Sequence, residues 1–331
     1  MEIKDNNIEN VTEDNIKNEN KKTPKRNVWI KRIFLILVVF FLGRYFYKNY
    51  DSYKELDINI SWSVFFIAVL FHFIYKVMQA LLWHYITYLN GCAINVKTAV
   101  LTYFYSILGK YIPGKVFMLL ARIPAYEEEG VPPRKVTVCF FLENVCTLLG
   151  AGFLFLISLL FFKNSVLENY RFATLGLIVV AIVMINPRII NFFLKLLEKV
   201  TKKDLQILIT YPQMILLVLL FVLNWAVLGA GFYLLVYSIY PVPLSQMLYV
   251  SGVFALSVII GILALFAPSG LGVREGIMIL GLGSIMQNEY AVLISVIARL
   301  WMTFSELSVI LLAWVIDFVK NKVFSSKQAK E

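Results

Sequence analysis

Residues 214–240 read MILLVLLFVLNWAVLGAGFYLLVYSIY, an apolar run without a single charged residue. About 20 apolar residues in a helix cross a hydrocarbon layer of roughly 30 Å, so this run predicts a transmembrane helix. Similar runs recur along the 331-residue chain, of which 60% is hydrophobic and only 16% charged. Since a soluble domain is about 45–50% apolar, the sequence predicts an all-α, polytopic membrane protein.

The apolar runs divide the chain into about six full spans and two interrupted stretches. Residues 1–28 are polar and are expected to form a disordered cytoplasmic tail, residues 29–318 a single transmembrane domain, and residues 319–331 a short basic cytoplasmic tail. The expected spans are 29–47, 62–88, 136–162, 171–187, 212–239 and 290–318, and the interrupted stretches are 98–122 and 247–286.

Basic residues between the spans predict the topology. The net charge is +10, and its placement beside spans favours orientation and contact with anionic headgroups over nucleic-acid binding. The basic, amphipathic segment 188–204 is expected in the cytoplasm, and it lies there only if 98–122 enters the membrane and returns to the same side. The lysines after the last span are cytoplasmic only if 247–286 likewise enters from outside and returns. These two re-entrant hairpins enter from opposite sides, which predicts the inverted repeat typical of secondary transporters of the cell membrane.

Both interrupted stretches contain a Pro/Gly break followed by a helix start and an arginine. Residues 109–115 read GKYIPGK and precede Arg122, and residues 268–275 read PSGLGVRE. Broken backbone in a membrane must be buried in protein or line a wet cavity, and helix N-termini favour anions. The simpler alternative is a pair of packing kinks. The candidate substrate-binding residues are Pro113, Gly114, Lys115, Arg122, Pro268, Gly270, Gly272, Arg274 and Glu275.

Charged residues inside the predicted spans are a second group of candidates, because such residues are costly in lipid and often functional. Arg299 and Glu306 are seven residues apart and share a helix face, and Glu143 lies in the span 136–162. They are expected either to line a translocation path or to form structural ion pairs. Lys76 lies in the middle of the span 62–88 and ranks below them.

Other chemistry finds little support in the sequence. Three cysteines without CxxC spacing and two histidines twelve residues apart do not predict a metal site. We found no Gly-rich phosphate loop and no Ser-His-Asp arrangement, so neither a cofactor nor a metal is expected, and no catalytic residue is assigned.

The two breaks resemble those of the flippase-like transmembrane region of lysylphosphatidylglycerol synthases, the multiple peptide resistance factor family. The second motif, Pro-x-Gly-x-Gly-x-Arg-Glu at 268–275, is the more specific, and the similarity covers most of 30–318. The resemblance implies a domain that moves a phospholipid, such as an aminoacylated phosphatidylglycerol, between leaflets. In full-length relatives a soluble C-terminal domain transfers lysine, and this chain, which ends at Glu331, is expected to be a stand-alone member without it.

Three functions follow as alternatives. The first is a flippase for an anionic phospholipid or another phosphate-linked lipid. The second is lipid modification, meaning the lysyltransferase reaction of the family name. The third is a non-catalytic membrane partner of a separate synthase or glycosyltransferase chain.

Overall fold

The computed structural model describes residues 59–111, 116–161, 171–201, 206–264, 270 and 272–328. The predicted tail over 1–28 and the first expected span over 29–47 lie outside these ranges. So do Pro113, Gly114 and Lys115 of the first break and Pro268 of the second. Within the described ranges every regular element is a helix, which confirms the predicted fold class.

Four long helices lie where full spans were predicted. They are α4 (Trp62–Leu89), α7 (Pro133–Phe161), α11 (Tyr211–Tyr237) and α14 (Asn288–Gln328). The last predicted span, 290–318, agrees with the candidate span Asn288–Phe318, and α14 continues beyond it to Gln328, so part of the expected basic tail is helical. Among the described residues, these four helices and the segment Leu244–Leu263 are long and apolar enough to cross a membrane.

The span predicted over 171–187 is the first part of a bent pair. Helix α9 (Arg171–Met184) ends just before Pro187, and α10 (Pro187–Thr201) begins there after a bend of 66°. Proline has no backbone N–H and cannot continue the preceding helix, which explains the position of the bend. Counted as one span, the pair brings the candidate spans among the described residues to six.

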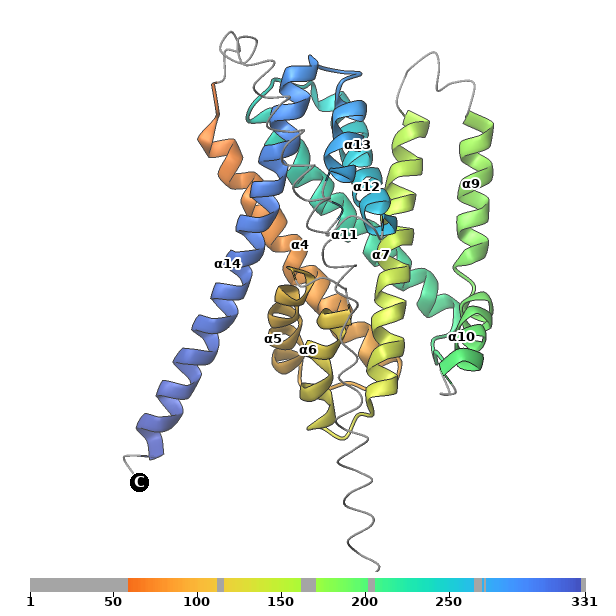
Figure 1. The fold of residues 1–331 in the computed structure, drawn as a ribbon, viewed down its shortest axis with the longest axis vertical. Coiled ribbons are helices and arrows are strands. Elements are labelled where there is room, and N and C mark those ends of the chain that lie inside the picture. Colours follow the sequence, from red (N-terminus) through yellow and green to blue (C-terminus); the bar gives the residue numbers. More distant parts are fainter. Residues whose placement is uncertain are drawn as a thin grey trace, which may run out of the picture.

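Two pairs of shorter helices flank the predicted breaks. The first pair is α5 (Val96–Ser106) and α6 (Val116–Glu127), with the 3-10 helix η1 (Ile107–Tyr111) after α5. The second is α12 (Met247–Leu263), preceded by η2 (Leu244–Gln246), and α13 (Val273–Leu282). In Figure 1 the α5–α6 pair lies in the lower half of the molecule and the α12–α13 pair in the upper half. Along the chain, the first pair lies between the long helices α4 and α7, and the second pair lies between α11 and α14.

Local signals in the sequence explain where several of these helices begin. The Asn95 side chain accepts a hydrogen bond from the backbone N–H of Lys97 and caps α5. At the start of α11, Gln213 Oε1 accepts from the backbone N–H of Thr210 at 2.9 Å. Helix α13 begins after Gly272, whose positive φ of 78° suits glycine, and Gly272 donates its N–H to Glu275 Oε2 at 2.7 Å.

Helix α11 lies at the centre of the core and packs against α4, α7 and α12. Small residues allow the close approach of its neighbours, as is usual between membrane helices. A Cβ added at Gly150 of α7 would lie 2.9 Å from the backbone carbon of Phe221, and one at Gly229 would lie 2.5 Å from Ser251 Cβ. The fully buried side chains of Phe221, Trp225 and Phe232 fill the space around these contacts.

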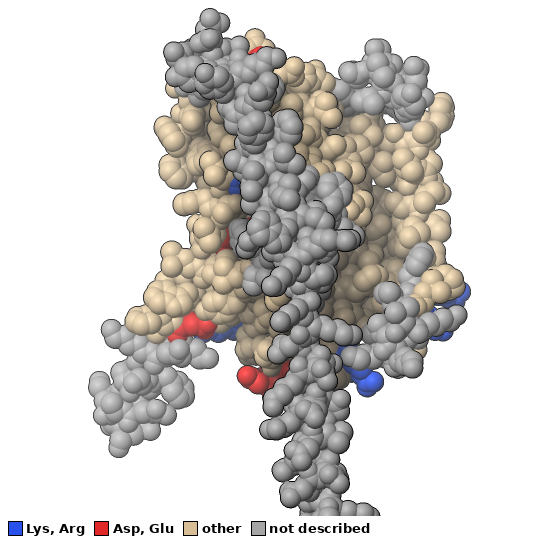
Figure 2. All heavy atoms as spheres, viewed as in Figure 1, with Lys and Arg blue, Asp and Glu red and all other residues tan. Residues whose placement is uncertain are grey.

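The outer surface is apolar, as lipid contact requires. Large exposed side chains are frequent on α4, α9, α11 and α14, including Leu70, Val180, Leu219 and Leu311. In Figure 2 most of the visible charged atoms lie along the lower end of the molecule, below a broad band of uncharged surface. This distribution is that of a multi-pass membrane protein.

Candidate functional site

Helix α14 carries a polar stripe through the interior of the molecule. Arg299, Met302 and Glu306 follow one another at spacings of three and four residues, so they share one face of the helix. Arg299 and Met302 both contact the start of α13, through Glu275 and Arg274, and Glu306 contacts α4 and η1. The shared face predicted for Arg299 and Glu306 is consistent with these contacts.

Glu306 is the carboxylate at the centre of the site. Its side chain is 1% exposed, and Oε1 lies 3.0 Å from Nζ of Lys76, while Oε2 forms an ion pair with Lys110. The lysine side chains are more open than the carboxylate, 12% exposed for Lys76 and 26% for Lys110. The two lysine side chains are therefore more accessible than the carboxylate that they share.

Arg274 brings a third cation to the same region from the second break. Its guanidinium donates from Nη2 to the sulfur of Met302 at 3.1 Å, and its Cζ lies 5.9 Å from the ring centroid of Phe254. Its Nε is buried without an acceptor among the described residues. A thioether is a weak acceptor, so Arg274 is a poorly paired cation. Met302 and Glu306 are one turn apart on α14, so Arg274 contacts this helix next to the carboxylate that pairs with Lys76 and Lys110.

The glycines of the second break hold Arg274 in place. Gly270 has a φ of 68°, and a Cβ there would lie 2.8 Å from Cα of Gly261 in α12. A Cβ on Gly261 would in turn lie 2.7 Å from Cδ of Arg274. The side chain of Arg274 thus lies against a surface that only glycine leaves open, which gives the predicted glycine at 270 a physical reason.

Glu275, the next residue, closes the start of α13. One of its oxygens accepts the N–H of Gly272, and the other forms an ion pair with Nη1 of Arg299 at 3.3 Å. Glu275 is buried, whereas the Arg299 side chain is 26% exposed. This pair joins α13 to α14 and fits the structural alternative considered for Arg299.

Arg122 and Glu143 form a separate group. Nη1 of Arg122 lies 2.5 Å from Oε2 of Glu143, and Nε donates to Oγ of Ser106 at 3.0 Å. The rings of Trp83 and Tyr103 cover the guanidinium at 4.2 and 4.4 Å from their centroids, and Arg122 is fully buried. This arrangement joins α6 to α7, and it is the structural alternative considered for Glu143.

Two residues at the centre were not among the predicted binding residues. Lys110 lies in the break motif at 109–115 but is not among the candidate binding residues predicted from the sequence. Lys76 ranks there below the other charged residues of the predicted spans. A third, His72, lies one turn before Lys76 on α4, fully buried, with its ring 4.8 Å from that of Trp301. Neither ring nitrogen of His72 has a partner among the described residues. The position of Lys76 in the middle of an apolar span is the sequence signal that points to the charged group around Glu306.

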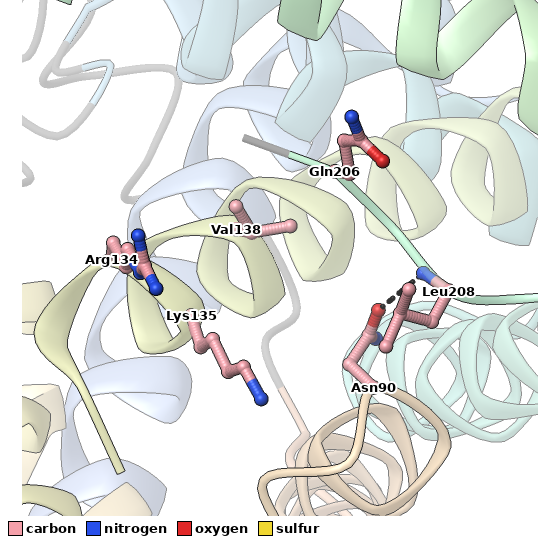
Figure 3. Close-up of a pocket in the computed structure, with 6 residues that line it drawn as sticks. All are labelled: Asn90, Arg134, Lys135, Val138, Gln206 and Leu208. Carbon is pink, nitrogen blue, oxygen red and sulfur yellow. Dashed lines mark hydrogen bonds between the residues drawn. The ribbon is translucent and has the colours of Figure 1, made fainter. Parts of the chain in front are cut away.

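A cavity of about 150 Å³ lies apart from these residues, where α4 ends and α7 begins. Figure 3 shows Arg134, Lys135 and Val138 of α7 on one side, and Asn90 and Gln206 on the other. Asn90 Oδ1 accepts the N–H of Leu208 at 3.1 Å and so joins the end of α4 to the segment that precedes α11. Arg134, Lys135 and Gln206 are exposed, so this cavity is a surface feature.

Together, the long apolar helices, the two broken pairs and the buried charged centre define a polytopic helical membrane protein. The sequence model of the lysylphosphatidylglycerol synthase TM region matches residues 28–307. The chain belongs to this family, as the two break motifs predicted. No curated protein matches it.

Proposed function

We propose that the protein moves a phosphate-bearing lipid between the leaflets of the cell membrane and binds its headgroup at the centre described above. One observation carries the proposal. Lys76 and Lys110 share one carboxylate, that of Glu306, and Arg274 contacts Met302 one turn away on the same helix. The excess positive charge is suited to an anion.

Phosphate chemistry fits this excess of positive charge. Lysine ammonium groups bind phosphate as point charges, and a guanidinium can bind it through two parallel hydrogen bonds. Arg274 has only a thioether and a ring as described partners, so a phosphate would supply the acceptors that it lacks. Arg274 also lies in the first turn of α13, where backbone N–H groups favour a negative charge.

The order of elements supports alternating access from the two sides. A long helix, a short helix, a break, a short helix and a long helix follow one another twice, in α4–α7 and in α11–α14. An ion pair joins the second short helix to the following long helix in both cases, but with the charges exchanged: Arg122 to Glu143, and Glu275 to Arg299. We infer an inverted repeat of six spans and two re-entrant pairs, with both termini cytoplasmic and the headgroup site between the repeats.

Substitution of Arg274 tests the proposal. The full-length protein is reconstituted in liposomes with phosphatidylglycerol that carries a fluorescent label on an acyl chain, and movement is followed by chemical quenching of the outer leaflet. We expect Arg274→Gln to slow movement at least about tenfold, because a charged hydrogen bond in a buried site contributes about 1.5–3 kcal/mol. The control Arg188→Gln removes an exposed arginine on α10 and should leave the rate unchanged.

The outcome that would refute the proposal is equally clear. If folded Arg274→Gln protein moves the labelled lipid at the wild-type rate, the cationic centre does not bind the headgroup. If the wild-type protein moves no phosphate-bearing lipid, the transport function itself is wrong. Lysylphosphatidylglycerol made in a host that otherwise lacks it would instead favour the lysyltransferase alternative.

A further inference from the structure

The buried carboxylates of the described residues all have partners, whereas Arg274 is poorly paired. Glu306 is shared by two lysines, and Glu275 accepts from Gly272 and pairs with Arg299. The third is Glu143, which pairs with Arg122, and the partly buried Asp317 accepts from Tyr105 at 2.7 Å. Among the described residues, the interior thus offers donors to a ligand, and each buried carboxylate is already paired.

This imbalance bears on which headgroup can bind. A lysyl ester adds two ammonium groups to the phosphate of phosphatidylglycerol and makes the headgroup net positive. Each buried carboxylate of the described residues that could accept from these ammonium groups already serves a lysine or an arginine. An ammonium group would also meet the positive charge of Lys76, Lys110 and Arg274 in a region where water screens charges poorly. Breaking a buried ion pair to satisfy it would be strongly unfavourable.

The direction of approach strengthens this selection. Lys76 and Lys110 are 12% and 26% exposed, while Glu306 behind them is only 1% exposed. An anionic group can reach the lysines without disturbing their ion pairs, because each ammonium has three donors. A cationic group reaches the carboxylate only by displacing them.

We infer that the site selects an anionic headgroup that carries phosphate and no amine, and that it discriminates against aminoacylated phospholipid. The inference rests on the proposed function, because it concerns the headgroup that the same centre binds. It differs from what the family description suggests, since that description names the lysylated lipid. The selection is carried by the partners of Glu306 and by the poorly paired guanidinium of Arg274.

Competition in liposomes tests the inference on the wild-type protein. Movement of acyl-labelled phosphatidylglycerol is measured with unlabelled phosphatidylglycerol or lysylphosphatidylglycerol added at equal fractions of the lipid. We expect the lysylated lipid to compete at least about tenfold less effectively, the factor that one moderately unfavourable charge contact produces. Equal or stronger competition by the lysylated lipid would overturn the inference.

A variant provides a second, independent readout. Lys110→Gln removes one of the two positive charges that pair with Glu306, so an incoming ammonium group is repelled less and the preference for the anionic lipid should narrow severalfold. Lys97→Gln, which removes an exposed lysine near the start of α5, should keep the wild-type preference. An unchanged preference in folded Lys110→Gln protein would count against the role of Glu306.

The two proposals fail in different ways. If the wild-type protein moves no labelled phosphatidylglycerol, the proposed function is wrong. If it moves that lipid and lysylphosphatidylglycerol competes equally well, transport stands and only the headgroup selection is wrong.

Discussion

Replacing Glu306 by glutamine should destabilise the protein through the lysines that it leaves behind. The carboxylate lies 3.0 Å from Lys76 and also pairs with Lys110. At an effective dielectric constant of about 20, one such contact corresponds to about 5–6 kcal/mol of Coulomb attraction. Removing one member of a buried pair typically costs about 3–5 kcal/mol. The partial exposure of both lysines places the expected loss at about 3 kcal/mol.

Thermal unfolding of the purified protein in detergent provides the assay. A loss of about 3 kcal/mol corresponds to a decrease in Tm of about 6–12 °C, at 2–4 °C per kcal/mol. Glu128→Gln, in an exposed loop, serves as the matched control and should change Tm little. Phosphatidylglycerol should then stabilise Glu306→Gln more than the wild type, because its phosphate takes the place of the missing carboxylate. Each tenfold gain in affinity adds about 1.4 kcal/mol.

Two results would refute this reasoning. A loss below about 1 kcal/mol in Glu306→Gln would mean that the lysines do not depend on the carboxylate. Equal stabilisation by phosphatidylcholine and phosphatidylglycerol would mean that the freed lysines do not bind a net anionic headgroup.

Further predictions concern the packing and the second buried ion pair. Arg122→Met should destabilise the protein by about 3–5 kcal/mol, because it leaves Glu143 buried and unpaired. Adding Glu143→Leu should restore most of the loss in Tm. A double variant with a Tm no higher than that of Arg122→Met would contradict this. Gly252→Ala should cost about 1–3 kcal/mol in thermal unfolding, because the new Cβ would lie 2.5 Å from Ser158 Cβ and push α7 from α12. Gly176→Ala, with no atom within 4 Å of the new Cβ, should be neutral or stabilising by up to about 1 kcal/mol, and a loss there would show that the assay does not report packing.

The long helices could be predicted from the sequence because membrane burial leaves a strong compositional signal. An uninterrupted apolar run must form a helix to satisfy its backbone in lipid, so α4, α7 and α11 begin and end within a few residues of the predicted bounds. The starts of α13 and α10 were also predictable, since Gly272 and Pro187 restrict the backbone locally. The last span could be predicted up to 318 because the apolar run ends there, whereas the continuation of α14 to Gln328 has no apolar signal in the charged sequence that follows.

The partners of the buried charges could not be predicted in the same way. Helical spacing correctly indicated that Arg299 and Glu306 share a face, but it says nothing about which elements face them. Glu306 pairs with Lys76 and Lys110, which are roughly two hundred residues away in the chain, and those pairs depend on how α14 packs against α4 and η1. Lys76 ranks below the other charges in the sequence because a lone lysine in a span is equally compatible with a peripheral position.

The polar stripe on α14 also has a mechanical consequence. From Arg299 to Asp317 the helix rises about 27 Å at 1.5 Å per residue, close to the roughly 30 Å of hydrocarbon in a bilayer. Along this length α14 contacts α13 through Glu275, η1 through Lys110 and α5 through Tyr105. A tilt of α14 would therefore change its contacts with both pairs of short helices at once.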